Sequence, residues 1–474
     1  MVRESGVKAS TLRGWFGAAA AAVVLVGVTV TTVPPEPAAV ADGGGVPGQP
    51  LGGIGPAERV ADRGQAARAA AVEDLLVRRA QALRQRDESA FLATIDPGAD
   101  QIFVDAQRAQ FGNLAGVPLS EWSYRLHADD VLDLAGRGRD GVDAVVPAST
   151  SATVDGGILA DGAELWAPAV ELRYGLQGVD QRPTSRPMGF LFVERDGRWY
   201  LRSDEELAAL GRRTWRGPWD FGPCRVTATE HGLVLYHPGS EAMVDRLVRE
   251  LDPAVRSVSA LWGDRWSGKV ALVLPDDPAE MRALVGPGFP VEAVVAVAVA
   301  DRVDTRTRTV DGQRVVLSPM GSRALSVPSL QVVLRHEITH VAARAETMDG
   351  SPMWLLEGFA DYVGYRDTSI SLRQGAPDLV ESVRHGGPPT ALPEDRGFRA
   401  RGRDLDLAYQ QAWSIARFVA DRYGEGQLVV LYRTLAGAGP VSAADTDAML
   451  RRLLGVDRGG LLAGWRSYLT AELR

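Results

Sequence analysis

Residues 334–341 read Leu-Arg-His-Glu-Ile-Thr-His-Val, which places the pattern H-E-x-x-H within an apolar run of helical spacing. His336 and His340 are four residues apart, so they project from the same face of a helix, one turn above the other. That arrangement lets two imidazoles bind one Zn²⁺ at roughly 2.0–2.1 Å. Glu337 lies beside them, where its carboxylate can accept a proton from water. These residues therefore predict a catalytic zinc site.

A second helical segment follows and offers the third protein ligand that a catalytic zinc site requires. After a polar turn, Ser351 and Pro352 are typical of a helix start, and residues 354–362 continue as Trp-Leu-Leu-Glu-Gly-Phe-Ala-Asp-Tyr. Glu357 is the expected ligand. Asp361 lies one turn further on the same face, where it can accept the free N–H of a zinc-bound imidazole and hold the ring in place.

The two motifs together resemble those of the gluzincin zinc metallopeptidases, in which the second helix supplies a glutamate ligand, often within W-x-x-E-G. The resemblance covers residues 329–366 and implies zinc on His336, His340 and Glu357, with Glu337 as the general base. Sixteen residues separate His340 from Glu357, fewer than in the gluzincin aminopeptidases, and no G-A-M-E-N-like stretch lies upstream. The resemblance therefore implies a peptidase of unassigned specificity and does not support aminopeptidase activity.

A catalytic zinc site also gains from a donor that stabilises the oxyanion formed at the substrate carbonyl. In gluzincins, a Tyr or His from the later helical region often has this role. Here the helical segment 407–422 carries Tyr409, and the loop-rich segment 366–405 carries His385. By analogy, Tyr409 is the expected donor and His385 the substitute, although a core aromatic is an equally good interpretation of Tyr409.

The first 65 residues predict an anchor followed by a spacer. Residues 1–14 are basic, and residues 15–33 contain no charge. As a helix, the apolar run would be about 28 Å long, close to the hydrocarbon thickness of a membrane. The basic flank places residues 1–14 in the cytoplasm and the bulk of the chain outside. A secretory signal cleaved near Ala41 is the alternative, less favoured because the run is long. Residues 34–65, rich in Pro, Gly and Ala, predict a flexible linker.

Residues 66–205 predict an α+β domain, because helical segments come first and extended segments follow. Asp196-Gly197 predicts a tight turn between the last two strands. The order of elements is similar to the nuclear transport factor 2-like fold, which implies a structural or binding module. Residues 206–223, with several Gly and Pro, are the expected junction. The expected helices are 69–84, 87–93 and 100–114, and the expected strands are 122–126, 144–146, 164–176, 188–194 and 198–202.

Residues 224–474 predict a zincin-like domain, with a small mixed sheet and the active-site helix followed by a mainly helical part. In gluzincins, an edge strand just before the zinc helix pairs with the extended substrate, and residues 315–318 are the expected edge strand. The other expected strands are 225–236, 270–274, 291–300 and 307–310. The strand at 307–310 is expected to form a hairpin with 315–317. The expected helices before the zinc helix are 241–261 and 278–284.

Composition narrows the range of functions. A chain of 474 residues accommodates an anchor and two domains, and a hydrophobic content of 45% supports a core in each. The net charge of −8, with no basic cluster beyond the N-terminus, argues against nucleic acid as a partner. Cys224 is the one cysteine, which excludes an internal disulfide, and it is expected to be buried.

We therefore expect a membrane-anchored, extracytoplasmic zinc metallopeptidase that acts on a peptide or protein substrate. Two alternatives remain. The chain is either a catalytically silent binding or regulatory protein that uses a peptidase fold, or a zinc hydrolase of a non-peptide bond.

Overall fold

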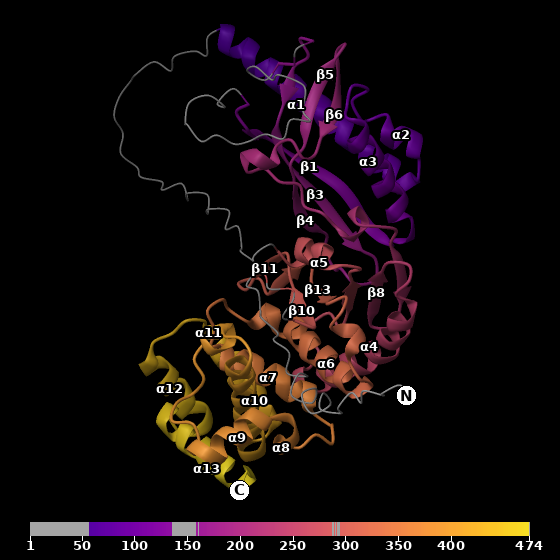
Figure 1. The fold of residues 1–474 in the computed structure, drawn as a ribbon. Coiled ribbons are helices and arrows are strands. Elements are labelled where there is room, and N and C mark those ends of the chain that lie inside the picture. Colours follow the sequence, from indigo (N-terminus) through magenta and orange to yellow (C-terminus); the bar gives the residue numbers. More distant parts are fainter. Residues whose placement is uncertain are drawn as a thin grey trace, which may run out of the picture. The chain divides into compact units, whose positions relative to one another are not determined.

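The computed structural model describes residues 56–134, 158–159, 161–286, 289, 291 and 294–473. The described chain forms two compact units, each of which is considered by itself (Figure 1). The N-terminal unit contains the described residues up to 176 together with residues 183–223, and the C-terminal unit contains residues 177–182 and those from 224 onward. Both units combine helices with small β-sheets, which confirms the predicted α+β class.

Several predictions concern residues outside this described part. They are the cytoplasmic tail at 1–14, the apolar run at 15–33, the cleavage site near Ala41 and the strand at 144–146. Within the described residues, no helix is both long enough and apolar enough to cross a membrane. The flexible linker predicted at 34–65 is wrong at its C-terminal end, because helix α1 already begins at Pro56. Pro is well suited to a first helical position, and the Ala, Glu and Arg residues that follow favour the helix.

The N-terminal unit is built from helices and two three-stranded sheets, ordered β1-β3-β4 and β2-β5-β6. Asp196 and Gly197 have φ angles of 52° and 75°, which confirms the predicted tight turn between β5 and β6. The described elements are α1 (Pro56–Gln85), α2 (Glu88–Leu92), α3 (Gln101–Asn113), β1 (Leu119–Val131), β2 (Leu165–Trp166), β3 (Pro168–Leu176), β4 (Thr184–Met188), β5 (Leu191–Arg195) and β6 (Arg198–Ser203).

The strand predicted at 188–194 is confirmed from residue 191 onward as β5 but is wrong at its start, because the chain crosses there from one sheet to the other. β4 ends at Met188 and pairs with β3, whereas β5 begins at Leu191 and pairs with β6. Gly189 lies at the crossing point, where an added Cβ would come within 2.3 Å of the Arg212 carbonyl oxygen. Only glycine leaves room for this approach of two backbones, a tertiary contact that strand periodicity does not reveal.

The segment predicted as a junction, residues 206–223, is packed against the N-terminal unit. Trp219 is buried, and its ring lies 5.4 Å from those of Trp122 on β1 and Tyr174 on β3 in edge-to-face geometry, with interplanar angles of 66° and 84°. Aromatic pairs of this kind stabilise a core beyond the area that they bury. The segment is therefore part of the N-terminal unit, whose likeness to the nuclear transport factor 2-like fold stays a prediction.

A buried ion-pair cluster centred on Asp96 holds the end of α2 to the β5–β6 hairpin. Its carboxylate accepts hydrogen bonds from Arg195 Nε at 2.6 Å and from Arg202 Nη1 at 3.1 Å. Replacing Asp96 with Ala would leave two guanidinium groups without their buried partner, so we expect the free energy of unfolding to fall by about 3–5 kcal/mol. Urea denaturation measures this loss. Asp161→Ala is the matched control, because Asp161 pairs with the same Arg195 from an exposed position and its loss is expected to matter much less.

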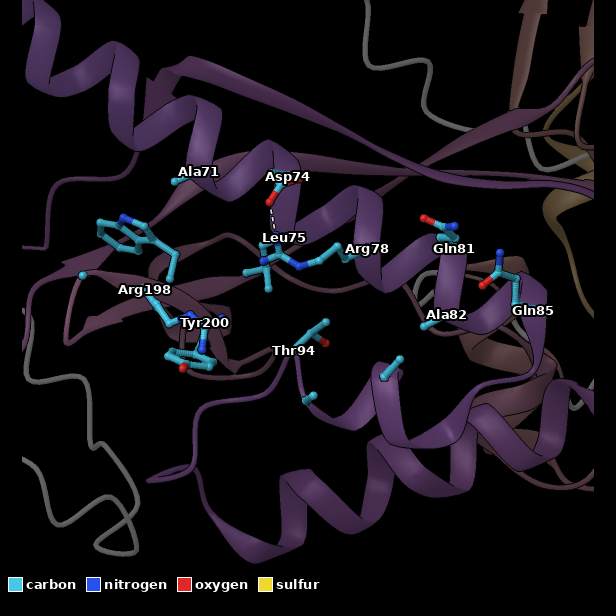
Figure 2. Close-up of a pocket in the computed structure, with 14 residues that line it drawn as sticks. Ala71, Asp74, Leu75, Arg78, Gln81, Ala82, Gln85, Thr94, Arg198 and Tyr200 are labelled. Atoms are coloured by element: carbon cyan, nitrogen blue, oxygen red, sulfur yellow. Dashed lines mark hydrogen bonds and ion pairs between the residues drawn. The ribbon is translucent and has the colours of Figure 1, made fainter.

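A shallow groove of about 530 Å³ runs along α1 in the same unit (Figure 2). Leu75, Ala82 and Thr94 form its buried floor, and α2 and the β5–β6 turn form the opposite wall. On its polar rim, the charges of Asp74 and Arg78 neutralise each other, because these side chains form an ion pair one helical turn apart on α1.

The C-terminal unit begins with a five-stranded sheet in the order β10-β13-β9-β8-β7, which is covered by helices α4 and α6 (Figure 1). β8, β9 and β13 are parallel to one another, whereas β7 and β10 are antiparallel to their neighbours. The elements are β7 (Arg225–Ala228), β8 (Gly232–Tyr236), α4 (Glu241–Trp262), β9 (Val270–Leu274), α5 (Pro278–Val285), β10 (Ala296–Val299), β11 (Arg302–Asp304), β12 (Thr309–Asp311), β13 (Arg314–Leu317) and α6 (Val327–Ala343).

Two strand predictions in this unit are wrong. The expected hairpin of 307–310 with 315–317 does not form, because β12 pairs with β11 in a separate two-stranded sheet. The expected edge strand at 315–318 corresponds to β13, which lies inside the sheet between β10 and β9. β10 is the edge strand instead. In both cases the strands pack on different parts of the unit. β13 packs against α5 and α6, whereas β11 and β12 pack against the short helix Arg344–Glu346. Strand partners depend on such tertiary contacts and not on proximity along the chain.

The rest of the C-terminal unit is mainly helical, as predicted, with α7 packed between α6 and α10. Cys224, at the start of this unit, is buried, in agreement with the prediction. The helices after α6 are α7 (Met353–Tyr365), α8 (Leu372–Gly375), α9 (Pro377–Gly386), α10 (Arg403–Tyr423), α11 (Glu425–Ala438), α12 (Ala443–Leu454) and α13 (Arg458–Leu473).

Candidate metal centre

Helix α6 carries the H-E-x-x-H motif into the core of the C-terminal unit. Its N-cap is Ser326, whose hydroxyl accepts a hydrogen bond from the Ser329 backbone N–H. The helix is then buried almost throughout its second half, so His336, Glu337 and His340 are all enclosed. Burial removes water that would compete for these side chains, which is what a preformed metal site needs.

Helix α7 brings Glu357 to the same place. The helix begins after Pro352, while the Ser351 hydroxyl donates to two backbone carbonyls, so Ser351 is not the N-cap expected from the sequence. Gly364 allows α7 to cross α6 closely, because an added Cβ would lie only 3.0 Å from the Val332 carbonyl oxygen. Glu357 is fully buried at this crossing and turns toward the two histidines.

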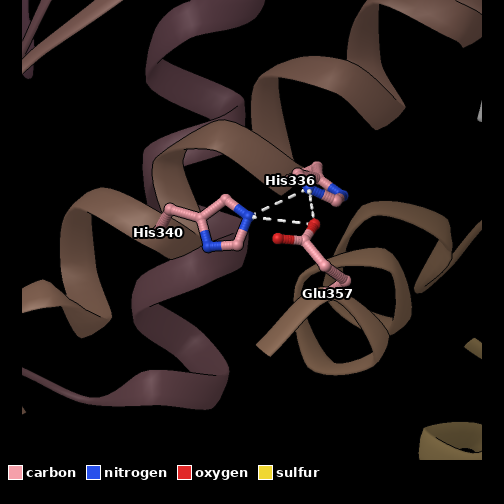
Figure 3. A group of neighbouring side chains, drawn as sticks. All are labelled: His336, His340 and Glu357. Atoms are coloured by element: carbon pink, nitrogen blue, oxygen red, sulfur yellow. Dashed lines mark hydrogen bonds and ion pairs between the residues drawn. The ribbon is translucent and has the colours of Figure 1, made fainter. Parts of the chain in front are cut away.

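Three ligand atoms of these residues form a compact triangle (Figure 3). The Nε2 atoms of His336 and His340 are 3.0 Å apart. The Oε2 atom of Glu357 lies 3.3 Å from Nε2 of His336 and 3.5 Å from Nε2 of His340. Ligands of a tetrahedral zinc ion at 2.0–2.1 Å are separated by about 3.3 Å. The triangle therefore has the dimensions of one face of a zinc coordination tetrahedron.

The charges at this place also fit a divalent cation. All four carboxylate oxygens of Glu337 and Glu357 are buried, and none forms a hydrogen bond of standard geometry with a described residue. Outside the triangle, the backbone of Ala298 approaches Glu337 and the hydroxyl of Tyr409 approaches Glu357. Burial raises the pKa of Glu337 above its ordinary value, and the neighbouring histidines only partly offset this effect. For Glu357, burial acts in the same direction but His340 and His336 lower its pKa overall. Two buried carboxylates with vacant lone pairs are the environment that a bound cation stabilises.

Asp361 supports the site from one turn further along α7. Its Oδ1 atom lies 2.8 Å from Nδ1 of His336, the ring nitrogen that faces away from the triangle. Burial alone would lower the pKa of His336, but the charges of Asp361 and Glu357 raise it well above its ordinary value. The geometry is that of a carboxylate that orients a metal-binding imidazole and fixes its tautomer.

We expect Asp361→Ala to weaken zinc binding by roughly 10–100-fold, because the ring of His336 loses the acceptor that orients it. Competition with a chromogenic chelator measures the affinity. Tyr362→Phe is the control, since Tyr362 is the next residue on α7 but hydrogen-bonds to Glu425 outside the site. Equal affinity in the two variants would show that Asp361 has no part in holding the ring.

Tyr409 on α10 reaches the same cluster. Its side chain is buried, and burial together with the charges of Glu357, Asp361 and Glu337 raises the pKa of its hydroxyl well above the ordinary value. The close approach of α7 and α10 depends on Gly358, because an added Cβ there would lie 2.4 Å from the Ala412 carbonyl oxygen. The glycine that follows Glu357 therefore lets α10 bring Tyr409 alongside the ligand helix.

His385, the substitute oxyanion donor, is not brought to the cluster. It is exposed on α9, and its Nδ1 atom lies 2.9 Å from the carbonyl oxygen of Glu381 in its own helix. Sequence reasoning also missed three contributors to the site. Gly358 and Gly364 set the helix spacings, and Ala298 on the edge strand β10 presents its backbone to Glu337. The glycines stand in the sequence beside the motif, but nothing in their local pattern shows which helix each one contacts.

Comparisons with known proteins add little to this geometry. No known protein family matches the sequence, and no curated protein matches it. Similar solved structures include the M1 zinc metallopeptidase from Deinococcus radiodurans, at 16% identity and a TM-score of 0.30, with 58% of each chain covered. A mutant of that enzyme bound to a Tyr-Ser-Ala substrate matches at 15% identity and a TM-score of 0.29, over 64% of this chain and 60% of the other.

The chain thus spans less than two thirds of the length of these metallopeptidases. At such TM-scores the overlap is too small to assign a fold or a family, so the functional proposal depends on the side-chain geometry.

Proposed function

We propose that this protein is a zinc-dependent metallopeptidase in which His336, His340 and Glu357 hold the metal. The observation that carries the proposal is the buried triangle of ligand atoms with edges of 3.0, 3.3 and 3.5 Å. Glu337, whose buried carboxylate forms no hydrogen bond of standard geometry with a described residue, lies beside it. Three protein ligands leave a fourth position open, which distinguishes a catalytic zinc site from a structural one.

A bound zinc ion supplies a Lewis acid that polarises a carbonyl group and increases the acidity of water. Glu337 accepts the proton of the attacking water and then delivers it to the departing amine. The hydroxyl of Tyr409 donates a hydrogen bond to the carbonyl oxygen as negative charge develops on it. Asp361 keeps the ring of His336 oriented throughout, so that this histidine does not have to reorganise during the reaction.

The edge strand β10 is positioned to bind an extended peptide substrate. It pairs with β13 on one side, and no other strand of the described residues pairs with its outer edge. α6 packs against this strand, and Ala298 on β10 is next to Glu337. An extended peptide that adds to this edge through main-chain hydrogen bonds would pass beside the general base.

The proposal is tested by zinc analysis of the purified protein together with digestion of a peptide library. We expect close to one zinc per chain, and cleavage that stops on chelation and returns with added zinc. A zinc-loaded protein that cleaves no peptide but hydrolyses an ester or another bond would reassign the substrate class. A protein that binds no zinc would contradict the proposal and favour the binding or regulatory alternative.

We expect Tyr409→Phe to lower kcat by roughly 10²–10³-fold with little change in zinc content, because a single oxyanion donor contributes about that much. Steady-state kinetics on any peptide found in the library screen measures the effect. Tyr432→Phe is a matched control, since Tyr432 is also buried but its hydroxyl pairs with Thr347. If Tyr409→Phe had the kinetics of the parent protein, Tyr409 would be only a core aromatic.

The uncharged run at residues 15–33, with its basic flank, leads us to propose further that the enzyme is tethered to the membrane with both units outside the cytoplasm. From its order of helices followed by strands, we also propose that the N-terminal unit is a binding module like nuclear transport factor 2. Protease added to intact cells tests the topology, because an extracytoplasmic chain is degraded while a cytoplasmic marker survives. A chain that is protected until the cells are lysed would contradict it.

A further inference from the structure

Two arginines that are distant in sequence lie against one carboxylate in the C-terminal unit, and a third arginine comes from a neighbouring loop. Glu346 belongs to the short helix η7 (Arg344–Glu346), which directly follows α6. Its carboxylate lies 3.2 Å from Arg433 Nε on α11 and 3.8 Å from Arg265 Nη1 just after α4. Arg308 comes from the loop between β11 and β12, and both of these strands pack against η7.

The cluster carries more positive charge than its own acid can neutralise. Arg433 and Arg265 share the one carboxylate, and Arg308 brings a third positive charge near Arg433. Three positive charges against one negative charge leave a surplus of two. Arg344 is not part of this surplus, because it is paired with Asp349. Arg308 is exposed and forms no ion pair with any described residue. The like charges of Arg265 and Arg308, added to burial, lower the pKa of Arg433 despite the presence of Glu346.

Arg433 is held in place before any ligand binds. Its guanidinium lies over the ring of Trp262, 4.4 Å from the centroid, and its Nη2 atom donates to the Trp262 carbonyl oxygen. Its Nε atom is buried and forms no hydrogen bond of standard geometry with a described residue, although the Glu346 carboxylate lies 3.2 Å away. A rigid guanidinium with unused donors loses little entropy when it binds an anion.

We propose that Arg265, Arg308 and Arg433 form a binding site for a small tetrahedral oxyanion, with inorganic phosphate as the matching ligand. A phosphate dianion balances the two surplus charges, and its oxygens suit the planar donor geometry of guanidinium groups. Glu346 lies just beyond the C-terminal end of α6, the helix that carries H-E-x-x-H. A phosphate bound by Arg265, Arg433 and Arg308 would therefore connect the end of α4, α11 and the β11–β12 hairpin to the end of α6.

Isothermal titration calorimetry of the full chain with sodium phosphate, at an ionic strength kept constant with NaCl, tests this proposal. We expect saturable binding of one phosphate, weakened at least about tenfold in Arg308→Gln and in Arg265→Gln, since each loses charge-assisted hydrogen bonds. Arg306→Gln is the matched control on the same loop, because Arg306 is 86% exposed and faces Asp304, and it should bind like the parent chain.

Glu346→Gln provides a test that a folding defect cannot imitate. Removing the competing carboxylate should strengthen phosphate binding, by about tenfold or more. The proposal is overturned if no saturable heat is seen, if all variants bind alike, or if Glu346→Gln binds more weakly than the parent chain. Equal binding in all variants would locate the phosphate elsewhere, including at a bound metal. The test does not depend on peptidase activity.

Discussion

Replacing Glu337 with Gln should lower the rate of peptide hydrolysis by roughly 10²–10⁴-fold, which is the range that a general base contributes, while the protein keeps its zinc. The amide has nearly the same shape as the carboxylate but cannot accept the proton of the attacking water. Glu337 lies beside the triangle and is not one of its corners, so metal binding should survive. The measurement is kcat/KM on a peptide from the library screen, with zinc content determined on the same sample.

Gln331→Ala is the control for this variant, because Gln331 lies on the same helix but faces Glu250 and not the site. It should retain the activity of the parent protein. Undiminished hydrolysis by Glu337→Gln would remove Glu337 from the mechanism. Loss of zinc in that variant would instead mean that Glu337 serves as a ligand.

The same substitution should stabilise the metal-free protein at neutral pH. Burial raises the pKa of Glu337 above the ordinary value of 4.5, so at pH values between the two the folded state binds more protons than the unfolded state. The free energy of unfolding therefore falls as pH increases through that interval. Gln has no proton to lose, so metal-free Glu337→Gln should be more stable than the metal-free parent at pH 7, and this advantage should vanish near pH 4.

Replacing His336 with Ala should remove the metal itself. His336 supplies one of three ligand atoms and also receives the support of Asp361, so its loss should cost more than the roughly 10–100-fold expected for a supporting residue. We expect zinc content near zero after gel filtration, with hydrolysis lost in parallel. Inductively coupled plasma mass spectrometry of purified protein measures the zinc.

His385→Ala is the matched control, because this histidine is exposed on α9 and lies outside the triangle. It should keep zinc and activity. A His336→Ala protein that is folded and still holds one zinc per chain would show that the metal binds elsewhere. Circular dichroism on both variants separates loss of metal from loss of structure.

Much of the secondary structure follows from local patterns in the sequence. The amphipathic run at 241–261 forms α4, and the apolar run at 270–274 forms β9, because spacing and burial there agree with local preference. The Asp196-Gly197 turn forms because two adjacent residues adopt positive φ. Strand pairing could not be predicted in the same way, as the interior place of β13 shows. A strand's neighbours depend on which helices cover the sheet, and those contacts join residues far apart in the chain.

The sequence by itself determined the chemistry of the proposed centre. A spacing of four on one helix places two imidazoles on one face whatever surrounds them, and W-L-L-E-G marks the helix that supplies a carboxylate. Only the tertiary structure decided which other groups join them. Gly358 and Gly364 contact backbones from distant segments, and this brings Tyr409 to the centre while His385 stays outside. Local periodicity determines the direction of a side chain on its own helix, but the distance between helices is decided by atoms of both.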